Sequence, residues 1–257
     1  MQQYLIPSEF FATTPTHLLD VFSHFASQPW AMLLDSAAPE HVNSRFDILV
    51  AEPIATLEAA QSETVLTDET GTHRYQTDPF TVLDAVLKRY FPTPADSSLP
   101  FVGGALGYFG YDLGRYIEKL PHTASADIAL PDLAIGFYQW ALILDKQQQQ
   151  LWCVDYAGSA QERWQKLQQR LTQSSAFTND FTLTGNWQAN MDKAGYTERF
   201  NQVQQYLLSG DCYQINLTQR FSAPYQGDEW HAYRTLRDKN AAPFSAFIRL
   251  PQGAVLS

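Results

Sequence analysis

Short apolar runs separated by turns of only a few residues constrain the fold of this chain most strongly. Between residues 30 and 57, the runs AMLLDS and FDILVAEP alternate with polar or proline-containing breaks. Residues 137–156 read FYQWALILDKQQQQLWCVDY, which predicts two strands joined by a glutamine-rich turn. Such a turn joins antiparallel neighbours, because parallel strands need a long crossover connection. The sequence therefore predicts mainly antiparallel sheets, in place of the βαβ pattern of a parallel sheet.

Three segments carry apolar residues at helical spacing. The segment 78–91, DPFTVLDAVLKRYF, opens on the start signal Asp-Pro and places Lys-Arg in its last turn. Residues 161–171 predict a second helix, and residues 192–209 predict a third, which Gly210 ends. The apolar face of the third helix comprises Tyr196, Phe200, Val203 and Leu207. The sequence therefore predicts helices as well as antiparallel strands.

Motifs that would announce a particular chemistry are absent from the sequence. The glycine-rich segment 99–116, LPFVGGALGYFGYDLGRY, contains neither GxGxxG nor GxxxxGK[ST], so its glycines are interpreted as places where strands bend or pack closely. The six histidines show no metal-ligand spacing, and no GxSxG occurs. The motifs therefore predict no metal ligand and no hydrolase nucleophile.

Charge and apolar patterning exclude several classes of partner. The formal charge of −10 disfavours nucleic-acid phosphates and anionic membranes. The longest apolar stretch, residues 133–144, is shorter than the roughly 20 residues of a membrane-spanning helix. The N-terminus lacks the features of a signal peptide, and the two cysteines, Cys153 and Cys212, suit a reducing compartment. We expect a cytoplasmic protein that contacts neither nucleic acid nor membrane.

A second period-two pattern lies in residues 212–221, CYQINLTQRF, which predicts a strand. Its polar face would carry Gln214, Asn216, Thr218 and Arg220. Alternate residues of a strand point to one side, so these side chains could line a polar ligand cavity. A face exposed to solvent explains the same pattern. The spacing alone leaves both interpretations open.

The run SGDCYQINLTQRF at residues 209–221 strongly resembles a strand of the chorismate-utilising enzymes, which include anthranilate, isochorismate, salicylate and aminodeoxychorismate synthases. Four earlier runs resemble the aminodeoxychorismate synthase component I branch of that family in the same order: WAMLLDS, SRFDILVAEP, GGALGYFGYDLGR and LPDLAIGFYQWALILD. APFSAFIRL at residues 242–250 also fits this branch, whereas anthranilate synthases usually have proline, tyrosine and methionine at Pro243, Phe244 and Ser245.

The resemblance implies a fold and a reaction. The fold is α+β, with antiparallel sheets packed face to face and helices outside. The reaction is the amination of magnesium-bound chorismate to 4-amino-4-deoxychorismate for folate synthesis, with ammonia delivered by a glutamine amidotransferase subunit. The catalytic lysine and glutamates and the Mg²⁺ ligands belong to family segments that are not found in this sequence. We therefore expect no catalytic residue and no bound metal in this chain, and no activity from the chain alone.

The resemblance also implies a tryptophan site. By motif match it would use Ser36, the loop residues Asn43, Ser44, Arg45 and Phe46, and the strand residues Pro243, Phe244 and Ser245. Ser36 and Arg45 are then predicted to lie beside residues 243–245. Alternatively, the two phenylalanines are core residues and Arg45 is a surface charge. The match departs at Asp35, which leaves the charge preference of the ligand open.

The organisation along the chain is predicted from the same observations. A Ser/Thr/Asn-rich stretch at residues 172–190 marks a boundary between an N-terminal component I domain, residues 1–180, and the start of an incomplete chorismate-binding domain, residues 190–257. The last run, IRLPQGAVLS, predicts a strand, a turn and a strand that would leave an unpaired sheet edge, so we expect a truncated chain. The alternatives are an anthranilate synthase large subunit and a non-catalytic module for tryptophan binding or partner docking.

Overall fold

The computed structural model describes residues 1–8, 18–38, 40–121, 123, 127–172 and 180–257. The chain divides into two compact units. The first contains Met1–Phe177 and Ala232–Ser257, and the second contains Thr178–His231. This division differs from the predicted boundary, because residues 232–257 join the first unit. They do so because β15 (Ser245–Leu250) hydrogen-bonds to β2 (Met32–Asp35).

The first unit contains two sheets. Sheet A has seven strands in the order β1-β10-β9-β3-β2-β15-β16, and sheet B has five in the order β6-β5-β4-β8-β7. All ladders between the described strands are antiparallel, as predicted. The remaining strands of sheet A are β1 (Gln2–Leu5), β3 (Phe46–Val50), β9 (Trp140–Asp145), β10 (Gln150–Asp155) and β16 (Gly253–Leu256). Sheet B consists of β4 (Ala55–Ala60), β5 (Glu63–Asp68), β6 (Gly71–Tyr75), β7 (Gly104–Phe109) and β8 (Leu133–Tyr138).

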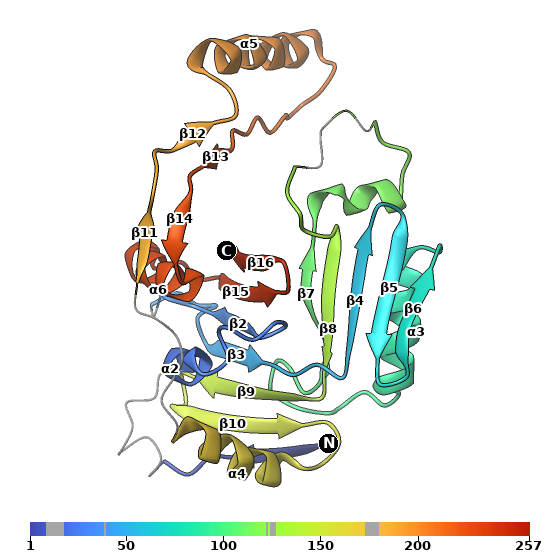
Figure 1. The fold of residues 1–257 in the computed structure, drawn as a ribbon, viewed down its shortest axis with the longest axis vertical. Helices are drawn as coiled ribbons and strands as arrows, with labels where there is room; N and C mark the ends of the chain where they lie inside the picture. The colour runs from blue at the N-terminus through green and yellow to red at the C-terminus, as the bar shows by residue number, and fades with distance from the viewer. Residues whose placement is uncertain (9–17, 39, 122, 124–126, 173–179) are drawn as a thin grey trace. The chain divides into compact units, whose positions relative to one another are not determined.

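A shared core holds the two sheets against each other. In Figure 1 the strands of sheet A are drawn horizontally and those of sheet B vertically. Leu106 and Tyr138 of sheet B pack in one buried cluster with Met32 and Ile143 of sheet A. The Tyr138 hydroxyl donates to the carbonyl of Trp30 at 2.7 Å, which satisfies its one polar group inside this core. Face-to-face packing of antiparallel sheets is thus confirmed.

Helices cover the outer surfaces, as predicted. Helix α3 (Pro79–Tyr90) packs Val82 and Val86 against sheet B, and Asp78 caps it by accepting from the amides of Phe80 and Thr81. Helix α4 (Ala160–Leu171) lies on β10 and β1. Further helices are α2 (Leu18–Ser23), the 3-10 helix η1 (Tyr111–Tyr116) and α6 (Glu229–Asn240). In the described part of the chain, every helix is too short or too polar to cross a membrane.

The second unit contains two short strand pairs and a long helix. Strand β11 (Phe181–Leu183) pairs with β14 (Tyr225–Gly227), and β12 (Gln188–Ala189) pairs with β13 (Phe221–Ser222). Helix α5 (Lys193–Ser209) begins after its cap Asp192 and ends at Gly210, where φ is +79°. These ends match the prediction. The predicted apolar face is not buried, however, since α5 contains no buried residue.

The predicted strand over residues 212–221 is wrong for most of its length. The structure shows irregular backbone over residues 212–220 and a strand only at Phe221–Ser222, opposite Gln188 and Ala189. A period-two pattern is a local property, whereas a strand also needs a neighbour that accepts and donates its backbone hydrogen bonds. β12 provides that neighbour for two residues only.

Candidate functional site

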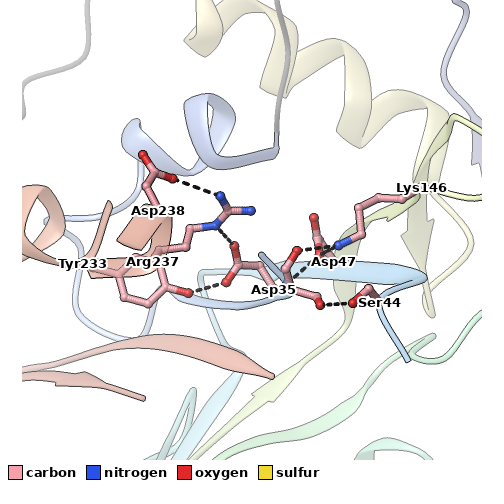
Figure 2. Close-up of polar contacts among 8 residues, drawn as sticks. Asp35, Ser44, Asp47, Lys146, Tyr233, Arg237 and Asp238 are labelled. Atoms are coloured by element: carbon pink, nitrogen blue, oxygen red, sulfur yellow. Dashed lines mark hydrogen bonds and ion pairs between the residues drawn. The ribbon is translucent and has the colours of Figure 1, made fainter. Parts of the chain in front are cut away.

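A group of buried and partly buried polar side chains gathers where β2 ends in sheet A. We call it the β2 polar cluster, and it comprises Asp35, Ser36, Ser44, Asp47, Lys146, Tyr233 and Arg237 (Figure 2). Asp35 lies opposite Ser245 across the β2–β15 ladder, and Leu33 lies opposite Phe247. Opposite residues share a sheet face, and Phe247 packs edge-on against Phe22 of α2 and Tyr233 of α6. Asp35 therefore points to the side that these two helices cover.

The Asp35 carboxylate receives one donor on each oxygen from helix α6. The Tyr233 hydroxyl donates to Oδ1, and Arg237 Nε donates to Oδ2 (Figure 2). The two donors are four residues apart, so they lie on one helix face. Burial raises the pKa of Tyr233 well above its ordinary value, with the negative charge of Asp35 adding to the effect. Burial alone would lower the pKa of Arg237, but its hydrogen bond to Asp35 and the negative charges of Asp35 and Asp47 together raise it.

A second ion pair lies beside the first. Lys146 Nζ donates to Asp47 Oδ1 at 2.7 Å and to the carbonyl of Ser36 at 2.8 Å. The same Oδ1 accepts from the amide of Ser36 at 3.0 Å. Burial raises the pKa of the Asp47 carboxyl, although the hydrogen bond from Lys146 opposes the shift. Two aspartates and two cations balance each other, which is the condition for burying such charges.

The two serines of the cluster bind each other. Ser36 Oγ donates to Ser44 Oγ at 2.6 Å, and both residues are 5% exposed. This contact closes the loop between β2 and β3. Hydroxyl groups are able both to donate and to accept, so this pair could exchange its mutual bond for bonds to a polar ligand.

The structure brings some of the predicted tryptophan-site residues together. The Asp35–Ser245 pair and the bond from the Ala37 amide to the Ala242 carbonyl, at 2.9 Å, place Ser36 across from Pro243 and Phe244. Just over two hundred residues separate these two segments in the sequence. The predicted proximity of Ser36 to this strand is thus observed, while its role with a ligand stays a prediction.

Arg45 binds elsewhere. Its guanidinium holds both oxygens of Asp145, with Nη2 at 2.7 Å from Oδ2, and it lies 4.5 Å above the Phe46 ring. Burial would raise the pKa of Asp145, but the hydrogen bonds from Arg45 and two backbone amides lower it. The described contacts of the Arg45 side chain are thus with Asp145 and Phe46, and none places it on residues 243–245. Phe46 itself is partly buried at the edge of the core shared by the two sheets.

The other loop residues are at the surface. The amide of Asn43 donates to His41 Nδ1 at 3.2 Å, and the His41 ring meets the Phe244 ring edge-on at 6.3 Å between centroids. Phe244 is 69% exposed. Phe244 thus offers an exposed apolar ring next to the segment that carries Ser36.

Four members of the cluster were missed from the sequence: Asp47, Lys146, Tyr233 and Arg237. Asp47 had a usable signal, because a charged residue inside the apolar run FDILV must find a partner when the strand is buried. Tyr233 and Arg237 had a weaker one, their spacing on one face of α6. Nothing in the local sequence identifies Asp35 as their partner.

The predicted chorismate-site residues lie at the surface of the described structure. Gln214, Asn216 and Thr218 are exposed, and Gln214 Nε2 donates to Asn216 Oδ1 at 3.3 Å. They lie in the irregular segment 212–220, so they do not share a strand face. Their role stays a prediction.

The same residues offer no site for a metal ion. Within the ranges that the structure describes, no three His, Cys, Asp or Glu side chains group closely enough to hold an ion. The two aspartates of the cluster are already bound by cationic and hydroxyl donors. These residues do not fit Mg²⁺.

An open groove lies apart from the cluster, between the β4–β5 turn and η1. Tyr116, Ser62 and Asp132 line this groove. The Tyr116 hydroxyl accepts from the amide of Ser62 at 3.2 Å and donates to Asp132 at 3.4 Å. None of the predicted site residues lines this groove. We therefore take the β2 polar cluster as the candidate site.

Comparisons with known proteins agree with the resemblance. The chain is 51% identical to aminodeoxychorismate synthase component 1 of Escherichia coli (strain K12) over 238 residues, which are 92% of this chain and 51% of that protein. It is 22% identical to anthranilate synthase component 1 of Acetivibrio thermocellus over 254 residues, 90% of this chain and 51% of that one. The chain thus spans about half the length of the curated relatives it matches.

A solved structure shows the same fold. The crystal structure of anthranilate synthase component I from Streptococcus pneumoniae TIGR4 superposes with a TM-score of 0.67 at 22% identity, over 81% of this chain and 48% of that chain. A sequence model of the family described as chorismate binding enzyme matches residues 30–257. The chain therefore belongs to the chorismate binding enzyme family.

Proposed function

We propose that this chain is the N-terminal part of an enzyme that aminates chorismate to 4-amino-4-deoxychorismate. One observation carries the proposal: the chain is 51% identical to an aminodeoxychorismate synthase component 1 across 92% of its length. The sequence identity to the anthranilate synthase of Acetivibrio thermocellus is 22% over a similar span. We therefore propose 4-amino-4-deoxychorismate, and not anthranilate, as the product.

The remaining participants of the reaction belong to the same proposal. Ammonia would come from a glutamine amidotransferase subunit, and Mg²⁺ would act in the whole enzyme through residues outside this chain. The chain would contribute the two packed sheets and the β2 polar cluster, and it would act in the cytoplasm. By itself it is expected neither to consume chorismate nor to bind Mg²⁺ specifically. Incubating the purified chain with chorismate, ammonia and Mg²⁺ and measuring chorismate by chromatography tests this.

Complementation in cells tests the amination. A chimera would join this chain to the second half of the Escherichia coli relative, in a host that requires para-aminobenzoate for growth. We expect the chimera to restore growth and the chain alone not to. Growth of a host that requires anthranilate, with no rescue of the first host, would favour the anthranilate synthase alternative and contradict the proposal.

We also propose that the β2 polar cluster binds tryptophan, because Ser36 and Ser44 meet beside Pro243 and Phe244. The hydroxyls would bind the charged end of the amino acid, and the exposed Phe244 ring would pack against the indole. Titration calorimetry with L-tryptophan tests this. Ser36→Ala should weaken binding by about 0.5–1.5 kcal/mol, the worth of one ordinary hydrogen bond.

Arg45 offers a second test of the tryptophan site. If it leaves Asp145 to meet the ligand carboxylate, Arg45→Ala should cost more than Ser36→Ala, since charge-assisted bonds are about twice as strong. If it stays with Asp145, its replacement should leave the affinity unchanged. Absence of any heat with the wild-type chain and with the chimera would end the tryptophan proposal without affecting chorismate amination.

A further inference from the structure

Both peptide groups that flank Ser36 are held by one ion pair. The amide of Ser36 donates to Asp47 Oδ1 at 3.0 Å, and the carbonyl of Ser36 accepts from Lys146 Nζ at 2.8 Å. The two side chains bind each other at 2.7 Å. The backbone on either side of Ser36 is thus fixed by a single pair of charges, Asp47 of β3 and Lys146 of the β9–β10 turn. Figure 2 shows these two side chains bound to each other.

This arrangement replaces the sheet ladder at the point where the ladder stops. The β2–β3 pairing ends at Leu34 and Ile48, so Ser36 lies two residues beyond the last paired residue. A backbone group buried there still needs a partner. Asp47 and Lys146 provide these partners from side chains, and they do so at a residue whose own hydroxyl is aimed at Ser44.

Burial makes the pair effective. The Asp47 side chain is 3% exposed and that of Lys146 is 25% exposed, so water has little access to the bonds around Ser36. A charged donor or acceptor makes a shorter and stronger hydrogen bond than a neutral one. The backbone that carries the Ser36 hydroxyl is consequently held by these two charged side chains.

We infer that Asp47 and Lys146 are positioning residues, which hold Ser36 in the orientation that presents its hydroxyl to an amino-acid ligand. This inference rests on the proposed tryptophan site for the identity of the ligand. The claim that Asp47 and Lys146 fix the Ser36 backbone rests only on their hydrogen bonds to its amide and carbonyl. The two parts are therefore tested separately.

Hydrogen exchange tests the hold without any ligand. The Ser36 amide should be protected in the wild-type chain, and Asp47→Ala, which removes its acceptor, should accelerate its exchange at least tenfold. Asp47→Asn keeps an acceptor oxygen and should give a smaller change. Exchange of Ser36 at the wild-type rate in Asp47→Ala would overturn the inference.

Titration calorimetry with L-tryptophan tests the ligand part. Lys146→Met should weaken binding about fivefold or more, and the double variant Ser36→Ala/Lys146→Met should bind within twofold of Ser36→Ala, because Lys146 acts through Ser36. Wild-type affinity in Lys146→Met, or additive losses in the double variant, would overturn the positioning role. If the wild-type chain binds no tryptophan, the ligand proposal fails. Hydrogen exchange alone then tests whether Asp47 and Lys146 fix the Ser36 backbone.

A matched control comes from the same sheet. Arg163 pairs with the buried Asp155 at 2.7 Å, and its side chain is 31% exposed, close to the 25% of Lys146. No described contact joins this pair to Ser36. Arg163→Met should therefore lower stability comparably while leaving tryptophan affinity and Ser36 exchange unchanged. An equal loss of affinity in this control would show that Lys146 acts through stability only and would overturn the inference.

Discussion

Replacing Arg237 by methionine would leave the Asp35 carboxylate in the interior with its cation removed. The Asp35 side chain has no exposed surface, and that of Arg237 is only 17% exposed, so water cannot easily take the place of the guanidinium. Breaking a buried ion pair by removing one partner costs about 3–5 kcal/mol. The Tyr233 hydroxyl would still donate to Asp35, which places the expected loss near the lower end, about 3 kcal/mol.

Urea unfolding, followed by circular dichroism at pH 7, measures this loss. The same helix provides a matched control in Arg234, which pairs with Asp20 at 3.3 Å while the two side chains are 37% and 43% exposed. An exposed pair of this kind contributes about 0–1 kcal/mol, so Arg234→Met should hardly shift the unfolding midpoint. Restoring neutrality with Asp35→Asn in the Arg237→Met background should recover part of the loss. Equal midpoints for the Arg237 and Arg234 variants would refute the reasoning.

Further predictions concern the sheets and the cysteines. Gly107→Ala would place a Cβ atom 1.9 Å from the Ala134 carbonyl oxygen, so we expect at least about 2–3 kcal/mol of destabilisation, seen as a large fall in the thermal midpoint; an unchanged midpoint would contradict the strand contact. Burial raises the pKa of Cys153 to about 12, so a thiol reagent at pH 7 should label Cys212 first, as mass spectrometry of peptides would show; equal labelling rates would contradict this burial. Hydrogen bonds from the side chain and the backbone of Thr70 lower the pKa of Asp68 from 3.8 to about 2. The stabilisation that ionised Asp68 gives the folded chain is therefore present above pH 4 and is lost as the pH falls towards 2. Asp68→Asn should therefore flatten the fall of the urea midpoint between pH 4 and 2, and an unchanged slope would count against it.

Local elements could be predicted because their signals are local. The Asp-Pro start, the apolar spacing and the basic last turn of residues 78–91 identified α3, which the structure bounds at Pro79–Tyr90. The hairpin at residues 137–156 was equally clear, and β9 and β10 pair across its turn. In both cases the interactions that decide the structure join residues close in sequence.

Long-range structure could not be predicted from the residues alone. Asp35 and Arg237 are separated by 202 residues, and no local pattern specifies that they form a pair. The pairing of β15 with β2 was expected only through the resemblance. The strand predicted over residues 212–221 was wrong for a related reason: the period-two pattern is local, and within these residues the described chain offers a strand partner only to Phe221.

The product made from chorismate tests the central claim most directly. The purified chimera of this chain with the second half of the Escherichia coli relative would be given chorismate, ammonia and Mg²⁺, and the products would be separated by chromatography and identified by mass. The account predicts 4-amino-4-deoxychorismate. Anthranilate as the product would contradict it.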